Sequence, residues 1–191
     1  MQSFLKRYVP RYWSLIHALL FYIIWFIAVK SVSAPAGENL ALSLQTFFVV
    51  LCLFVTLQTS GINAAKTELY FLIAIALLGL CVDGTLSFLG LFSFPFTEFY
   101  CASFWPYPLW LLGMWFCFGT AFRTSLAWLR KRALLQIAFG AVGGTLSLFA
   151  AFRLGAVEFP HGVAFTLAIV SIEWAVVMLL AFRIEAIFET I

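Results

Sequence analysis

Long apolar runs follow one another along most of this chain and constrain its fold more than any other feature. Hydrophobic residues make up 64% of the sequence and charged residues only 10%. Because this is too little polar surface to cover a soluble globule, the bilayer has to surround the protein. A membrane-spanning helix needs about 20 apolar residues. The runs predict an all-α, polytopic membrane protein, one transmembrane domain over residues 1–191, with six spans at about 13–29, 40–57, 69–92, 106–127, 133–152 and 162–182.

The first run has an alternative interpretation as a secretory signal peptide. Basic residues precede it and small residues follow it, as they do around a signal-peptide core. Such a core has about 7–15 apolar residues. This run is longer and richer in aromatic residues, and Pro35 would directly follow the cut. We therefore expect a retained helix.

The segment between the third and fourth runs, residues 93–105, is aromatic and carries one charge, Glu98. Amphipathic rings are enriched at the level of the lipid headgroups, so we expect an interfacial loop. Pro106 and Pro108 are expected in the first turn of the next helix, where amide hydrogens lack intrahelical partners.

Basic residues predict the orientation, because Lys and Arg in short loops resist translocation. If both ends are cytoplasmic, only Lys30 and Arg153 fall outside, and nine of the 11 basic residues fall inside. Those nine are Lys6, Arg7, Arg11, Lys66, Arg123, Arg130, Lys131, Arg132 and Arg183. The count predicts an N-in/C-in bundle, with Arg130, Lys131 and Arg132 in contact with lipid headgroups.

Two acidic residues, Asp83 and Glu173, lie inside apolar runs at similar predicted depths, where no Lys or Arg is expected. An ionisable residue near the middle of the membrane costs about 2.5–3.5 kcal/mol even on lenient scales. One hypothesis is a proton or cation site carried by both acids. The alternative, which we favour, is that each is protonated and hydrogen-bonded to a neighbouring hydroxyl such as Thr145 or Ser147.

Two further motifs are better explained by packing and surface chemistry. Gly140 and Gly144, with Gly143 between them, form a small-residue face that lets a neighbouring helix approach closely. At the outer rim, Arg153, Glu158 and His161 share one short connection. An exposed ion pair between the first two would contribute little stability.

Enzymatic and metal chemistry find little support in the sequence. The two histidines, His17 and His161, are predicted near opposite membrane surfaces, so they cannot form one metal centre. Nucleophile-elbow, phosphate-loop and zinc-protease motifs are absent from the sequence. We predict no catalytic residues, no metal site, no cofactor and no nucleic-acid partner. Membrane lipids are the expected partners, with other membrane proteins as further candidates.

Several short stretches carry a resemblance to a known family. They are Trp105 to Trp110, Met114 and Trp115, Ser125 to Leu129, Gly140 to Gly144, Arg153 to Phe159, and Glu173 with Trp174. Together they resemble a bacterial family of small inner-membrane proteins, domain of unknown function two-eight-seven-eight. The chain departs from the family pattern at Thr145, where a proline is usual, and at Arg123 and Thr124, where an Asn-His pair is usual.

The resemblance implies a location in the bacterial inner membrane and a loose association with membrane fatty-acid modification, but no established activity. Three functional hypotheses follow. The first is a non-catalytic accessory protein or subunit in lipid modification or envelope maintenance. The second is a small transporter or ion or proton carrier that uses Asp83 and Glu173. The third is a membrane-embedded lipid enzyme.

Overall fold

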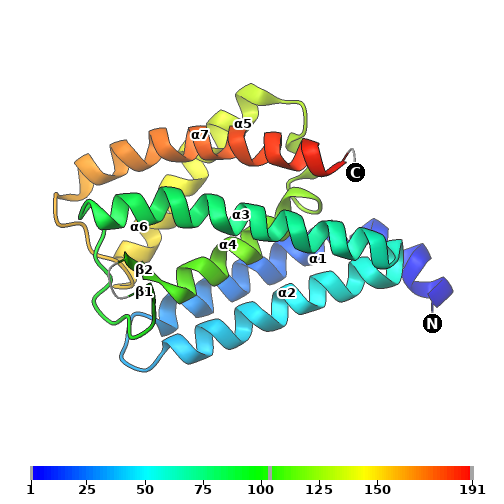
Figure 1. The fold of residues 1–191 in the computed structure, drawn as a ribbon, viewed down its shortest axis with the longest axis horizontal. Coiled ribbons are helices and arrows are strands. Elements are labelled where there is room, and N and C mark those ends of the chain that lie inside the picture. Colours follow the sequence, from blue (N-terminus) through cyan, green and yellow to red (C-terminus); the bar gives the residue numbers. More distant parts are fainter. Residues whose placement is uncertain (1, 103–104, 190–191) are drawn as a thin grey trace.

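A computed structural model describes residues 2–102 and 105–189, with side chains for residues 12–99 and 107–189. Helices dominate it (Figure 1). They are α1 (Gln2–Ser31), α2 (Glu38–Ser60), α3 (Ile62–Phe88), α4 (Leu109–Phe122), α5 (Ala133–Phe139), α6 (Thr145–Arg153) and α7 (Val163–Glu189), with a 3-10 turn η1 (Ala127–Leu129) and a π-helical turn η2 (Gly140–Gly144). Two short antiparallel strands, β1 (Tyr100–Ala102) and β2 (Trp105–Pro108), form a hairpin before α4.

Five helical segments are long and apolar enough to cross a membrane. They are Tyr12–Ser31, Glu38–Ser60, Ile62–Phe88, Ala133–Arg153 and Val163–Glu189. Many large apolar side chains on these segments are exposed, as in a protein that lipid surrounds. The all-α, multi-pass membrane architecture expected from the sequence is therefore confirmed.

The fourth predicted span, residues 106–127, differs most from the structure. Helix α4 has 14 residues, fewer than the about 17–25 that a spanning helix usually needs. Pro106 lies in strand β2 and Pro108 caps α4, so neither proline occupies the predicted first helical turn. After Phe122 the chain leaves the helix through turns and η1. Hydropathy predicts one helix over this apolar run because it does not distinguish apolar residues of a hairpin from those of a helical turn.

Other helices also begin or end at residues that differ from the predicted bounds. Helix α3 begins at Ile62, before the predicted start at residue 69, and ends at Phe88, before the predicted end at 92. Helix α7 continues to Glu189, beyond the predicted end at 182. Glu68 and Glu185 are consequently helical side chains, although the sequence pattern placed both outside the spans.

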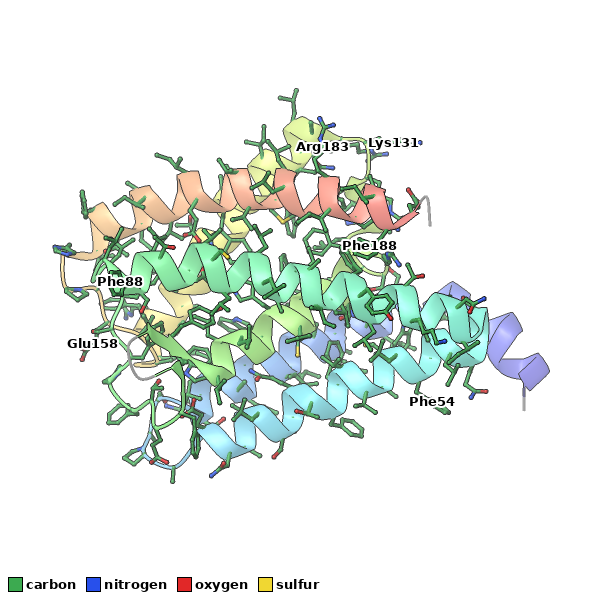
Figure 2. All side chains as sticks on the ribbon, in the orientation of Figure 1. Phe54, Phe88, Lys131, Glu158, Arg183 and Phe188 are labelled. Atoms are coloured by element: carbon green, nitrogen blue, oxygen red, sulfur yellow. The ribbon has the colours of Figure 1, made fainter. Side chains whose placement is uncertain are left out.

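The helices run alternately up and down, so their connections gather at two ends of the bundle (Figure 1). One end holds the α2–α3 junction, the turn after α4 and both chain ends; Lys131 and Arg183 lie at this end in Figure 2. The opposite end holds the α1–α2, α3–α4 and α6–α7 connections, and Glu158 lies there. We call these the basic end and the loop end. The turn with Arg130 and the α6–α7 connection lie at opposite ends of the bundle. Which end faces the cytoplasm stays a prediction.

Hydrogen bonds hold the connections of the loop end together. One carboxylate oxygen of Glu38, Oε2, accepts the backbone N–H groups of Glu98 at 2.9 Å and Phe99 at 3.0 Å. Ser93 and Glu158 form an isolated antiparallel bridge. These bonds fasten the α3–α4 connection to the other two connections, and thereby fix where α4 enters the bundle.

Candidate functional site

The two mid-membrane acids meet in the folded chain. Asp83 of α3 is 6% exposed and accepts a hydrogen bond at 2.7 Å from the indole Nε1–H of Trp115 in α4. Glu173 of α7 faces it closely enough for the two carboxyl groups to interact. Both Glu173 oxygens are nevertheless buried without a hydrogen-bond partner among the described residues.

This arrangement differs from the hydroxyl caps that the favoured sequence hypothesis assigned to the acids. The partner of Asp83 is an indole. Thr145, an expected cap, has a buried hydroxyl without a hydrogen-bond partner among the described residues. Asp83 is consequently held by one indole, and the Glu173 carboxyl group beside it keeps free acceptor capacity among the described residues.

A stacked pair of indoles positions the acids. The rings of Trp115 and Trp174 lie 5.3 Å apart between centroids and 12° from parallel. Two glycines make room for them, since a Cβ atom at Gly79 would overlap the Trp115 ring and one at Gly144 would overlap the Trp174 ring. A Cβ at Gly140 would likewise overlap the backbone of α7 at Trp174. The glycine face predicted in the fifth run therefore packs around Trp174.

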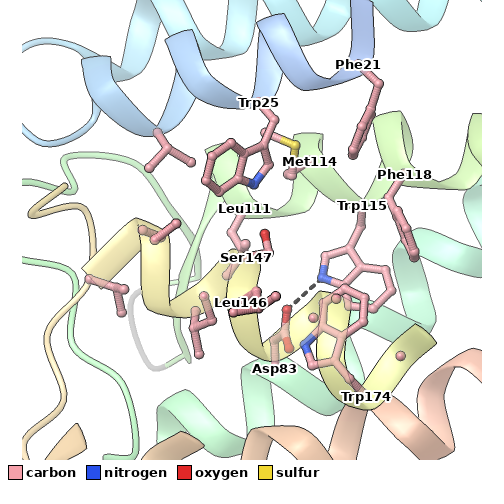
Figure 3. Close-up of a pocket in the computed structure, with 18 of the residues that line it drawn as sticks. Phe21, Trp25, Asp83, Leu111, Met114, Trp115, Phe118, Leu146, Ser147 and Trp174 are labelled. Atoms are coloured by element: carbon pink, nitrogen blue, oxygen red, sulfur yellow. Dashed lines mark hydrogen bonds between the residues drawn. The ribbon is translucent and has the colours of Figure 1, made fainter. Parts of the chain in front are cut away.

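A cavity of about 390 Å³ opens beside the acids. Figure 3 shows it between α1, which contributes Trp25, and α6, which contributes Ser147, with Met114 and Trp115 of α4 behind. We call it the cleft. It is partly open, and Asp83 lines it close to the stacked indoles. Its volume lies in the range of about 300–1,000 Å³ typical of small-ligand sites.

The lining of the cleft is mostly apolar, and Asp83 is its one acidic side chain among the described residues. Aromatic, aliphatic and glycine residues make up nearly all of its lining, with Tyr22, Asp83 and Ser147 as the polar side chains besides the indoles. Its described lining residues include no Lys, Arg or His. A hydrocarbon chain can pack against such an apolar lining. A hydroxyl or amine group at the end of that chain could donate a hydrogen bond to Asp83.

The outer-rim residues lie at the end of α6 and in the α6–α7 connection, at the loop end of the bundle. Arg153 and His161 are exposed. The predicted ion pair between Arg153 and Glu158 is wrong for the described structure. Glu158 instead accepts a hydrogen bond from the Ser93 hydroxyl at 3.1 Å, because the backbone bridge to Ser93 turns its side chain toward that strand.

At the basic end, arginines bind acids that the sequence did not pair with them. Arg123 contacts Glu68 at 3.3 Å and Glu185 at 3.6 Å. Arg130 contacts Glu185 at 2.6 Å and Glu189 at 2.8 Å. We call these five residues the arginine cluster. Lys131 and Arg132 are exposed beside it, so two of the three residues predicted to contact headgroups carry exposed charge, and their contact with lipid stays a prediction.

No group of three His, Cys, Asp or Glu side chains within the described part of the chain is arranged to hold a metal ion. The sequence did not indicate Trp115 as the hydrogen-bond partner of Asp83, or Trp174 as the ring stacked on Trp115. Both are tryptophans in apolar runs, where a lipid-facing role is the ordinary expectation. Gly79 and Gly144 were the available signal, because glycines on facing helices indicate close approach of a large group.

Comparison with known proteins gives one match. The family model described as "Protein of unknown function (DUF2878)" matches residues 14–180. Neither a curated protein nor a solved structure matches the chain. The matched segment includes all the residues of the cleft and both acids.

Proposed function

The chain belongs to the DUF2878 family of proteins of unknown function, and from its cleft we propose that it binds the hydrocarbon tail of a membrane lipid. In this role it serves as an accessory protein in lipid modification or envelope maintenance in the bacterial inner membrane. The observation that carries the proposal is an apolar cleft of about 390 Å³ at the level of the membrane-spanning helices.

The position of the cleft favours a ligand that comes from the bilayer. Its walls belong to α1 on one side and to η2 and α6 on the other, and these segments are among those long enough to span a membrane. Leu146, which lines the cleft, is 61% exposed, so the apolar lining continues onto the outer surface. A lipid tail can therefore enter without crossing water.

The polar end of the cleft gives the ligand a direction. Asp83 lines the cleft and Trp115 holds it in place. We expect the bound molecule to carry a hydroxyl or amine group that donates a hydrogen bond to Asp83. A saturated tail without such a group would use only the aromatic wall and bind less tightly.

The carrier hypothesis is the second candidate, and the contact between Asp83 and Glu173 favours it. Two facing acids that have no basic neighbour in the described part of the chain offer a place for a proton or a monovalent cation. Protein in liposomes with an internal pH-sensitive dye should then show a proton flux that Asp83→Asn and Glu173→Gln each abolish. Equal dye responses in liposomes with and without the protein would exclude it.

Photo-crosslinking tests the lipid-tail proposal. Protein in nanodiscs receives a fatty alcohol that carries a diazirine in its tail, and the attached peptides are mapped by mass spectrometry. We expect attachment to cleft residues such as Met114 and Ser147. Gly143→Leu places a side chain in the cleft and should reduce this attachment about tenfold. The matched control is Val142→Leu, because Val142 is 59% exposed and absent from the lining.

Attachment spread evenly over the lipid-facing helix surfaces, and unchanged by Gly143→Leu, would contradict the proposal. Thermal unfolding of both variants checks that each is folded. A side chain at Gly143 has space, since the nearest atoms to an added Cβ belong to the Phe139 ring at 3.7 Å.

A further inference from the structure

A second buried polar site lies away from the cleft, between α1 and the turn after α4. His17 of α1 is fully buried, with Nε2 at 2.8 Å from the Thr120 hydroxyl and Nδ1 at 3.1 Å from the Ser125 hydroxyl. The rings of Trp13 and Phe48 pack against the imidazole. In the sequence, His17 stood out only as one of two histidines too far apart to share a metal ion.

The hydrogen bonds determine which nitrogen of His17 carries the proton. The Thr120 hydroxyl donates its single hydrogen to the Cys117 carbonyl oxygen at 2.6 Å, so it can only accept from His17. Nε2 therefore carries the proton in the neutral ring. Nδ1 keeps its lone pair and accepts the hydrogen of the Ser125 hydroxyl.

This geometry is that of an activated nucleophile. A serine becomes nucleophilic when an adjacent base accepts its proton and a third group orients the base. Here His17 is the base and Thr120 orients it. Ser125 itself is half-buried, in the turn after α4 at the basic end, so it is partly accessible from outside the bundle.

Helix attachment alone does not account for His17. The hydroxyl of Ser14, one turn earlier in α1, already donates to the Thr124 carbonyl at 3.2 Å and fastens α1 to the same turn. A leucine or phenylalanine at position 17 would fill the space between Trp13 and Phe48 without requiring two polar partners.

We propose that Ser125 and His17 form a nucleophile–base pair that hydrolyses a carboxylic ester of an anionic membrane lipid. The exposed charges of Lys131 and Arg132 at the same end favour the anionic headgroup. This site does not include any residue of the cleft, so it stands or fails independently of the lipid-tail proposal.

The chemistry balances with water as the only co-reactant. The Ser125 oxygen bonds to the ester carbonyl carbon while its proton moves to Nδ1 of His17. The carbon–oxygen bond to the lipid alcohol then breaks, and the departing oxygen takes that proton. Water attacks the acyl-serine in the same way, gives one proton to Nδ1 and restores the serine with release of a fatty acid.

Covalent labelling tests the pair directly. Full-length protein in phosphatidylglycerol nanodiscs is treated with a fluorophosphonate, and the modified residue is identified by mass spectrometry. We expect modification at Ser125, none there in Ser125→Ala, and a labelling rate about a hundredfold lower in His17→Gln, as removal of a general base typically gives. Glutamine keeps a donor and an acceptor for Thr120 and Ser125, so it separates proton transfer from packing.

The matched control is Ser14→Ala, which removes a neighbouring serine that bonds the same turn and should leave labelling of Ser125 unchanged. Release of fatty acid from phosphatidylglycerol vesicles, greater than from phosphatidylcholine vesicles and lost in Ser125→Ala, is the expected activity. Unlabelled Ser125 in the folded wild-type protein would overturn the pair, and this result does not depend on any variant folding. Equal labelling rates in the wild type and in His17→Gln would contradict the role of His17 as the base. Labelling of Ser125 without release of fatty acid would contradict the assignment of a lipid ester as the substrate.

Discussion

Two sets of buried acids in this protein have opposite surroundings. In the arginine cluster, Glu68 and Glu185 each contact Arg123, and Glu185 also contacts Arg130. At the cleft, Asp83 and Glu173 face each other, and Asp83 accepts a hydrogen bond from the indole N–H of Trp115. The first set is neutralised by cations, whereas the second borders a cavity and is not.

The difference separates a structural role from a functional one. The arginine cluster connects α3, α7 and the turn after α4 at one end of the bundle, and Arg123 also lies over the Phe71 ring, 4.9 Å from its centroid. Removing one member leaves a buried charge without its partner, which is costly. Among the described residues no cation pairs with the acids at the cleft, so their removal leaves no such charge behind.

The largest expected effect is therefore in the arginine cluster. Arg123→Gln should lower the free energy of unfolding by about 3 kcal/mol, the lower limit for a broken buried ion pair, because the Arg123 side chain is still 18% exposed. Thermal or denaturant unfolding in detergent measures it. The control is Arg183→Gln, an exposed arginine at the same end. Equal stability of the two variants would show that the cluster does not hold the helices.

A smaller loss is expected where glycine makes room for the indoles. Gly144→Ala adds a methyl group that would overlap the Trp174 ring. It should lower the free energy of unfolding by about 1–3 kcal/mol, as overpacking usually does. Gly143→Ala is the matched control, since its added Cβ meets the Phe139 ring at an ordinary 3.7 Å. Similar unfolding midpoints for the two variants would mean that the stacked indoles adapt easily.

The smallest effect is expected at the cleft acids. Asp83→Asn keeps an oxygen that accepts the Trp115 hydrogen bond, and Glu173→Gln replaces a side chain without a regular partner. Each should change the free energy of unfolding by less than about 1 kcal/mol. Glu68→Gln, which loses its ion pair to Arg123, should cost more. A large loss of stability in Asp83→Asn would show that the cleft acids have a structural role, as the arginine cluster does.

The sequence predicted the parts of the fold that depend on hydropathy. Five apolar helices follow from the runs, and the basic residues predict which connections share an end. Hydropathy failed where apolar residues do not form a helix, as at Tyr107 and Pro108 of strand β2. It also failed where a helix continues past its apolar core, which is why Glu185 was missed.

The candidate site was predicted in part for the same reason. Asp83 and Glu173 stand out because charged residues are rare in apolar runs, and similar positions along their helices indicated similar depth. Their contact, the Trp115 bond and the pairing of His17 with Ser125 join distant parts of the chain. Such pairings depend on how the helices pack, and a single sequence contains no record of it.

A structure determined by electron microscopy in lipid nanodiscs, with an antibody fragment bound to add mass, would test the cleft most directly. We expect density for a hydrocarbon chain between α1 and α6, ending at Asp83 while Trp115 holds that carboxyl group. Helix α1 packed against α6, with no space between Trp25 and Ser147, would contradict the proposed lipid site.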